Sequence, residues 1–159
     1  MSVTSANSVR ASTAVDLVAI RGLLISAALP IQDLDSAAGL RFWVAEDGGQ
    51  LIGAIGLELF GATGLLRSLV VSPSHRVHGL GSTLVSILER DVTAQGVQAL
   101  VLLTETAEGF FRRRGYRVVE RSVVPDEIKQ SAEFRSLCPA SAVCMTKLPL
   151  STSEGVFDG

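Results

Sequence analysis

A glycine-rich turn between an expected strand and an expected helix is the feature that most constrains the fold. The segment LLRSLVVSP (residues 65–73) is rich in leucine and valine and predicts a strand. The segment STLVSILERDVTAQG (residues 82–96) predicts a helix that ends at Gly96. Between them RVHGLG (residues 76–81) fits R-x-x-G-x-G. Such a turn presents N–H groups at the positive end of a helix and predicts a phosphate or pyrophosphate site.

Two well-known phosphate loops fit this segment poorly. The dinucleotide-binding fingerprint has three glycines and an acidic residue after the following strand, and the Walker loop ends in Gly-Lys-Ser/Thr. Neither pattern is present around residues 76–81. A tight turn that only packs the helix on the strand remains an alternative at this stage.

The surrounding elements predict one mixed sheet. Residues 12–29 predict a helix with a capping box formed by Thr13 and Asp16, and a second short helix is expected within residues 31–40. The other expected elements are strands at 41–46, 50–60, 99–104, 116–123 and 141–147, a short helix at 107–114, and an irregular or partly helical segment at 125–139. The first two strands form a hairpin around DGG. The strand–helix–strand unit that contains the glycine turn predicts a parallel pair with a right-handed crossover. The expected fold class is therefore α/β, with helices on both faces of the sheet.

Composition restricts the function classes. The chain has 159 residues, and we expect a single domain over residues 1–150 with a loose tail at 151–159. A net charge of −2 provides no basic field for nucleic acid, and no apolar run is long enough to span a membrane. Cys138 and Cys144 match no common zinc spacing, so no metal is expected. The N-terminal segment lacks the apolar stretch of a secretion signal, and we expect a cytoplasmic protein.

Two motifs resemble those of the GCN5-related N-acetyltransferases (GNAT). LVVSPSHRVHGLG (residues 69–81) is similar to their phosphate loop and the strand before it, and FFRRRGY (residues 110–116) is similar to a later motif. The resemblance implies the GNAT fold, a mixed, mostly antiparallel sheet with a splayed parallel pair, and acetyl-CoA as co-substrate. The strings LLRSLVVSP, AEGFFRRRGY and EFRSLCPASAVCM more narrowly resemble acetyltransferases that accompany arsenic-resistance genes.

The resemblance also implies where acetyl-CoA binds. Backbone N–H groups of residues 76–82 would hold the pyrophosphate, and the main chain of residues 69–71 would pair with the pantetheine arm. Val77 and His78 depart from the residues usual in this loop. The implied cofactor-binding residues are Leu69, Val70, Val71, Arg76, Val77, His78, Gly79, Leu80, Gly81, Ser82, Thr104, Phe110, Phe111 and Arg113.

Acyl transfer to an amine needs a base and a group that stabilises the oxyanion. Glu58, in the otherwise apolar strand AIGLELF, is the first candidate for the base, and the alternative is a solvent-facing side chain. The backbone N–H of Val71 is the candidate for the oxyanion. Arg67 is a charge inside LLRSLVV and needs a partner, either Glu58 or an anionic group of the substrate. Glu105 and Glu108 are weaker candidates for the base.

The usual acid for the leaving thiolate is missing. Many members of the family have a tyrosine where this chain has Phe111, and Tyr116 is expected to pack in the core. The candidate acceptor-binding residues are Arg67, Thr104, Phe134, Cys138 and Ser141. The two cysteines are interpreted either as arsenical-binding thiols or as small buried apolar residues.

These features predict an acetyl-CoA-dependent N-acetyltransferase that acts on a small amine. The arsenic resemblance suggests a toxic amino-acid-like compound or an organoarsenical as acceptor. Two alternatives are a protein or peptide N-acetyltransferase and a non-catalytic CoA-binding sensor. No nucleic-acid or membrane partner is expected, and the resemblance leaves open whether the chain forms a homodimer.

Overall fold

The computed structural model describes residues 7–29, 31, 40–74, 79–131, 134 and 141–148. Its elements, in chain order, are β1 (Asn7–Ala11), the 3-10 helix η2 (Ala14–Asp16), α1 (Leu17–Ser26), β2 (Leu40–Asp47), β3 (Gln50–Phe60), β4 (Thr63–Val71), α2 (Leu80–Ala94), β5 (Ala99–Thr104), α3 (Glu108–Arg112), β6 (Arg117–Val118), η4 (Arg121–Val123), α4 (Asp126–Lys129) and β7 (Val143–Lys147). None of the helices in these described ranges has the length and apolar character needed to traverse a lipid bilayer.

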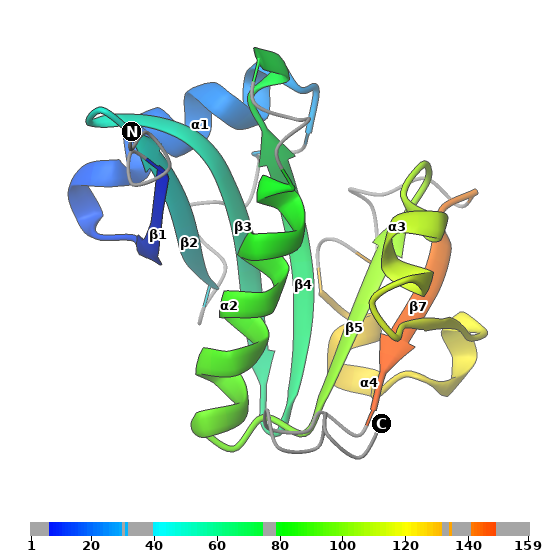
Figure 1. Ribbon diagram of the computed structural model, residues 1–159. Coiled ribbons are helices and arrows are strands. Elements are labelled where there is room, and N and C mark those ends of the chain that lie inside the picture. The colour runs from blue at the N-terminus through cyan, green and yellow to red at the C-terminus, as the bar shows by residue number, and fades with distance from the viewer. Residues whose placement is uncertain are drawn as a thin grey trace. The chain divides into compact units, whose positions relative to one another are not determined.

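The seven strands follow the order β1-β2-β3-β4-β5-β7-β6 (Figure 1). Contacts within the chain divide it into two compact units. One comprises Met1–Leu57 and Ser68–Asp91, and the other comprises Glu58–Arg67 and Val92–Gly159. The long strands β3 and β4 each contribute residues to both units.

In the first unit, helices cover both faces of the strands. Phe42 and Val44 of β2 pack against α1 through Ile20 and Leu24. Their neighbour Trp43 points to the opposite face, because successive side chains of a strand alternate, and its Nε1 donates a hydrogen bond to Oδ2 of Asp91 beyond the middle of α2 (2.8 Å). The alternation of β2 therefore places α1 and α2 on opposite faces.

An ionic network joins β1 to the start of the α1 segment. The predicted capping box is present, with the Thr13 N–H donating to Oδ2 of Asp16 (2.7 Å). Arg10 of β1 donates to both carboxylate oxygens of Asp16 at 2.8 and 3.0 Å and also pairs with Glu46 of β2 at 3.2 Å. The hydrogen bonds from Arg10 and then from Thr13 lower the pKa of Asp16 to about 2.

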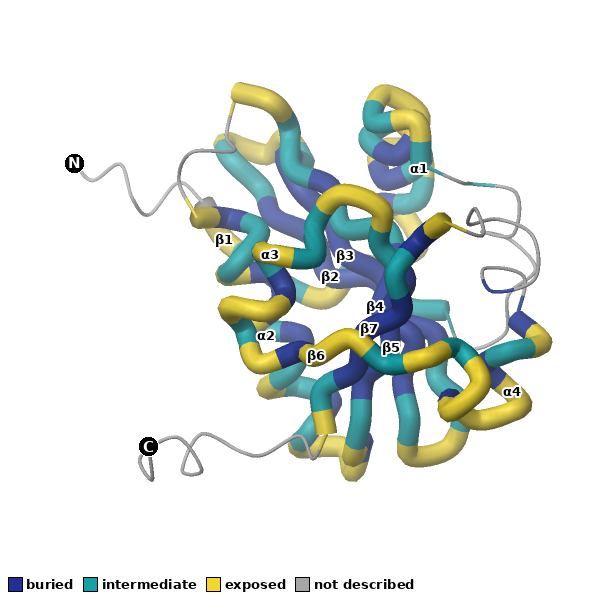
Figure 2. The backbone as a smooth tube through the Cα atoms, turned by 90° about the vertical axis from the view of Figure 1, so that its right-hand side faces the viewer, coloured by how far each residue is buried: buried dark blue, intermediate teal, exposed yellow. Residues whose placement is uncertain are grey.

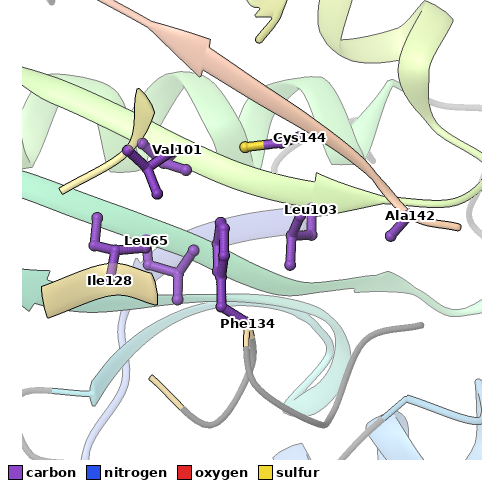
Figure 3. Packing of buried hydrophobic residues seen from close by; sticks show 8 residues of the cluster. Leu65, Val101, Leu103, Ile128, Phe134, Ala142 and Cys144 are labelled. Carbon is purple, nitrogen blue, oxygen red and sulfur yellow. The ribbon is translucent and has the colours of Figure 1, made fainter. Parts of the chain in front are cut away.

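In the second unit, the first residues of β4 pair parallel with β5, as predicted. The chain between the two strands contains α2. β5 then pairs antiparallel with β7. One face of these strands carries an apolar cluster that Figure 3 shows from close by. The buried members of this cluster are Leu65, Val101, Leu103, Val124, Ile128, Phe134, Ala142 and Cys144.

The opposite face of the second unit holds the segment after α3. Cys144 of β7 belongs to the apolar cluster, so Lys147, three residues further along, points to the other face. There its Nζ lies 5.6 Å from the ring centroid of Tyr116. The segment after α3 thus lies on one face, and α4 lies on the side of the cluster through Ile128. Figure 2 shows β3, β4, β5 and β7 as largely buried, whereas β6 and parts of α1 and α4 are exposed.

Most expected elements are confirmed, and two expectations were wrong. The hairpin of β2 and β3, the crossover and the strand at 99–104 are present, and Gly96 follows α2 with φ +99°. The N-terminal segment, for which no strand was expected, forms β1. The strand expected over residues 116–123 is reduced to β6, because Val118 and Val123 remain exposed and the chain turns into η4. The expected helix within 31–40 and the tail at 151–159 lie almost wholly outside the described residues.

Candidate active site

The strand β4 provides the main chain that was expected to bind the pantetheine arm. Its recorded pairs with β5 run from Thr63↔Ala99 to Leu65↔Val101, whereas β4 itself continues to Val71. Ser68 has φ +60°, a left-handed conformation that is uncommon for a residue with a side chain. Beyond it, the Ser72 N–H donates to the Ile52 carbonyl oxygen of β3 at 2.7 Å. Leu69, Val70 and Val71 therefore lie past the part of β4 that pairs with β5.

The described end of the glycine loop consists of Gly79 and the first turn of α2. Gly79 has φ +69°, and an added Cβ would meet no atom within 4 Å among the residues that the structure describes. Its carbonyl oxygen accepts hydrogen bonds from N and Oγ1 of Thr83 at 3.1 and 3.2 Å, which starts α2 at this point. The first turn, which contains Leu80, Gly81 and Ser82, carries no acidic residue that would compete with an anion. Arg76, Val77 and His78 lie outside the described residues.

Two contacts hold α2 against the first unit's strands. Gly53 of β3 faces the helix, and a Cβ at this position would lie 3.2 Å from Cδ1 of Leu84 and 3.5 Å from Cδ2 of Leu80. Further along, the hydrogen bond from Trp43 ties Asp91 to β2. The missing side chain at Gly53 thus allows the first turns of α2 to approach the strand closely.

In the second unit, Glu58 and Arg67 form a buried ion pair. Nη1 of Arg67 lies 3.6 Å from Oε1 of Glu58, and the exposed fractions of the two side chains are 0% and 9%. A solvent-facing Glu58 was the alternative considered from the sequence, and burial shows that it was wrong. Of the two partners considered for Arg67, the structure shows Glu58. The catalytic role of Glu58 stays a prediction.

The ion pair shares a face of the second unit with the apolar cluster. Leu65 and Arg67 are two residues apart on β4, so their side chains point to the same side, and Leu65 packs in the cluster with Phe134. Phe134, a candidate acceptor residue, is buried beside Leu65 and Leu103 (Figure 3). The structure therefore brings Glu58, Arg67 and Phe134 to one face of these strands.

Thr104 and Ser141 lie where β5 ends and β7 is about to begin. The Thr104 hydroxyl oxygen accepts a hydrogen bond from the Ala107 N–H at 3.0 Å, which orders the turn into α3. The Ser141 hydroxyl donates to Oε2 of Glu105 at 3.2 Å. Glu105 is thus held at the edge of this unit. Cys138 lies outside the described residues.

The sequence reasoning missed Arg121 in this area. It lies in η4, within the segment that was expected to be a strand, so no local signal pointed to it. Its Nη2 donates to the Ala142 carbonyl oxygen at 2.7 Å, and its guanidinium carbon lies 6.0 Å from the Phe134 ring centroid. Burial raises the pKa of the neighbouring Cys144 thiol, and the positive charge of Arg121 partly opposes this change. Cys144 therefore fits the interpretation of a small buried apolar residue.

The aromatic side chains of the motif at residues 110–116 pack against one another. Phe111 is buried, and its ring meets those of Phe110 and Tyr116 edge-on, with centroid distances of 5.0 and 5.3 Å. Tyr116 is buried, as predicted.

Three arginines follow the aromatic pair of this motif. Arg112 pairs with Glu108 at 2.7 Å, and Arg114 stacks over the Phe110 ring at 4.1 Å. Arg113, the arginine expected to reach a CoA phosphate, is exposed at the end of α3.

The amino-acid sequence matches a family model and two bacterial relatives. The model of the family described as "Acetyltransferase (GNAT) domain" matches residues 38–118, a range that contains both the glycine loop and the aromatic motif. The uncharacterized N-acetyltransferase CT2212 of Chlorobaculum tepidum is 32% identical over 104 residues, which are 65% of this chain and 64% of that protein. A Bacillus subtilis acetyltransferase, BSU40680, is 36% identical over 78 residues, 48% of this chain and 53% of that protein. The chain thus spans less than two thirds of either relative.

A solved structure extends the likeness to most of the chain. Rv2747 from Mycobacterium tuberculosis, crystallised in complex with CoA, has a TM-score of 0.74 and 27% sequence identity. The similarity covers 90% of this chain and 99% of that one. The predicted architecture of a mixed sheet with a parallel crossover pair is confirmed at this level.

Proposed function

The chain belongs to the GNAT acetyltransferase family, and from this premise we propose that it transfers the acetyl group of acetyl-CoA to the amine of a small molecule. The observation that carries the proposal is the described end of the glycine loop. There, a left-handed Gly79 precedes a helix whose first turn has no acidic residue. Acetyl-CoA is the co-substrate of the family, and the similarity to Rv2747, which was crystallised with CoA, supports this assignment.

The residues of the chain are suited to three separate tasks. Gly79, Gly81 and the first-turn N–H groups of α2 would bind the pyrophosphate, and the main chain of residues 69–71 would pair with the pantetheine arm. The N–H of Val71 would donate to the oxyanion that forms when the amine attacks the acetyl carbon. Glu58 would accept the proton, because an alkyl amine with a pKa of roughly 10 is only about 0.1% uncharged at pH 7.

The leaving group needs no dedicated acid in this scheme. A thiol such as that of CoA has a pKa of roughly 8.5, so its thiolate leaves at modest cost. Phe111 carries no proton to donate, and Tyr116 is buried against Phe111 on one side and Lys147 on the other. We therefore assign Tyr116 a packing role.

The acceptor is proposed to be a toxic amino-acid-like amine or an organoarsenical, acetylated in the cytoplasm. This finer assignment is supported by the segments LLRSLVVSP, AEGFFRRRGY and EFRSLCPASAVCM, which resemble arsenic-associated acetyltransferases. Residues 1–150 are proposed to form one catalytic domain, as the length of the chain suggests.

The test is mass spectrometry of an amine panel incubated with acetyl-CoA and the full chain. The panel contains alkyl amines, amino acids, an amino-substituted organoarsenical and a peptide with a free N-terminus. Acetylation of a small amine is the expected result. Acetylation of the peptide alone would replace the small-molecule acceptor by a protein acceptor, and binding of acetyl-CoA without any turnover would favour the sensor.

A glycine variant tests the loop independently of the acceptor. We expect Gly81→Val to abolish acetyl-CoA binding in calorimetry while the thermal transition is retained, because the side chain would occupy the phosphate position. Gly22→Val is the matched control, since Gly22 lies on α1 with no atom within 4 Å of an added Cβ. Unchanged affinity in Gly81→Val would remove the loop from the acetyl-CoA site.

A further inference from the structure

We propose that Arg67 is a positioning residue that acts through Glu58, holding its carboxylate charged and oriented to accept the proton of the acceptor amine. The inference rests on the proposed function, because it requires Glu58 to serve as the base. The proposal gives a role to Arg67, the buried cation of β4. Neither the glycine loop nor the aromatic motif accounts for this residue.

The side chains of Arg67 and Glu58 are buried to different extents. The Arg67 side chain is fully buried, whereas the Glu58 side chain retains 9% of its exposure, and Oε1 lies 3.6 Å from Nη1 of Arg67. Glu58 is thus the less buried member of the pair, while its Oε1, the oxygen nearest Arg67, is buried. Both residues are on long strands, which fix their positions more firmly than loops would.

The energetics indicate that the pair is not there for stability. Removing two charges from water costs more than their attraction usually returns, and apolar residues of similar volume commonly stabilise a core at least as well. Leu65, two residues before Arg67 on the same face of β4, belongs to the apolar cluster. A functional task for Glu58 explains why a charged pair is present.

The cation also determines what the carboxylate can do. A carboxyl group buried among apolar side chains without a cation favours its protonated form, which cannot take up another proton. With Arg67 beside it, Glu58 can remain ionised. In the reaction the amine nitrogen attacks the acetyl carbon, the carbon–sulfur bond breaks, and CoA leaves as the thiolate. The amine proton passes to Glu58, while Arg67 neither gains nor loses a proton.

Four variants of the full chain separate positioning from structural support. Arg67→Lys keeps a cation, Arg67→Met removes it, and Glu58→Met combined with Arg67→Met replaces the pair by apolar residues. Arg10→Met is the matched control, because it removes a cation from the carboxylate network of the first unit. Each variant is measured for thermal stability, for kcat with the best acceptor of the amine panel, and for the KM of acetyl-CoA.

We expect Arg67→Met to lower kcat by roughly 10²-fold, as for loss of a general base, with the KM of acetyl-CoA changed less than about twofold. Arg67→Lys should recover a large part of kcat. The double apolar variant should be at least as stable as the unmodified chain and, because it lacks the base, as inactive as Arg67→Met. If Arg67→Met fails to fold, Arg67→Lys tests the role of Arg67, because it keeps Glu58 in place. Arg10→Met should lose stability and keep kcat.

The results that would overturn the role of Arg67 differ from those that would overturn the proposed acetyltransferase function. A double apolar variant that retains kcat would overturn the role of Arg67 and of Glu58, leaving the acetyltransferase assignment intact. An Arg67→Lys variant as inactive as Arg67→Met, but stably folded, would also overturn it. If the unmodified chain acetylates nothing in the panel, the proposed function itself fails, and Arg67 has no base to position.

Discussion

Gly53 is the position on β3 where one added methyl group should push α2 away from its strand. The side chain of any residue here points toward the helix. An ideal Cβ would lie 3.2 Å from Cδ1 of Leu84 and 3.2 Å from the backbone oxygen of Val70. Leu84 can adjust its side chain, but the Val70 carbonyl belongs to β4 and cannot move alone. Gly53→Ala therefore requires a shift of the backbone or of the helix.

The expected magnitude follows from these two distances. Both distances are shorter than most contacts of a Cβ atom, so each neighbour would have to move by a few tenths of an ångström. Inserting a methylene into a packed core costs about 1–3 kcal/mol, and replacing glycine by alanine recovers about 0.4–1 kcal/mol from the unfolded chain. The net loss should be about 1 kcal/mol, or about 2–4 °C in Tm for a chain of this size. Valine adds two further carbon atoms and should cost more.

Thermal unfolding followed by circular dichroism, together with calorimetry of acetyl-CoA binding, tests this reasoning. Gly22→Ala is the matched control, because it lies within α1, where a Cβ meets nothing within 4 Å. That variant should gain up to about 1 kcal/mol from helix propensity. Gly53→Ala should also weaken acetyl-CoA binding, since the first turn of α2 is displaced. A Gly53→Ala variant as stable as Gly22→Ala would refute the close approach of α2.

Three further predictions concern other contacts. Because hydrogen bonds lower the pKa of Asp16 from 3.8 to about 2, its ionised form stabilises the fold above pH 4, and this contribution is lost as the pH falls from 4 toward 2. Solvent screening of the partly exposed Arg10 reduces the contribution to about 1–2 kcal/mol, and thermal melts of Asp16→Asn should show a flatter acid limb. Trp43→Phe should cost about 1–2 kcal/mol in denaturant unfolding, because it removes the donor to Asp91. Phe111→Tyr should leave kcat nearly unchanged while lowering Tm, because the added hydroxyl is buried between aromatic rings; a large rise in kcat would contradict a scheme without an acid.

The sequence predicted the elements whose signals are local. Thr13 and Asp16 determine where the first helical segment starts, Gly96 ends α2, and the continuous apolar run of residues 99–104 predicts β5 with its observed bounds. β1 was missed because Asn7–Ala11 is short and polar, and it is held by pairing with β2 and by Arg10. Such tertiary partners leave no periodic pattern in the segment itself.

The parts of the candidate site that have a local sequence pattern could be predicted. A glycine loop before a helix is visible in the sequence, and so is a charged residue inside an apolar strand. The sequence left two possible partners for Arg67, namely Glu58 and an anionic group of the substrate. Which side chains meet across two strands depends on the strand register, which the sequence does not reveal. Arg121 could not be found at all, since its contacts with Ala142 and Phe134 depend on a turn after β6 that the sequence suggested was a strand.

The strand β4 connects the parts of the proposed mechanism. Its first half pairs with β5 and places Arg67 beside Glu58, and its second half contains the main chain assigned to acetyl-CoA. Ser68 stands between them with φ +60°, a conformation that costs a residue with a side chain about 1–2 kcal/mol. A regular strand would avoid this cost and could continue its pairing with β5. The irregular strand instead has three residues beyond Ser68, the segment whose main chain we propose to pair with an extended pantetheine arm.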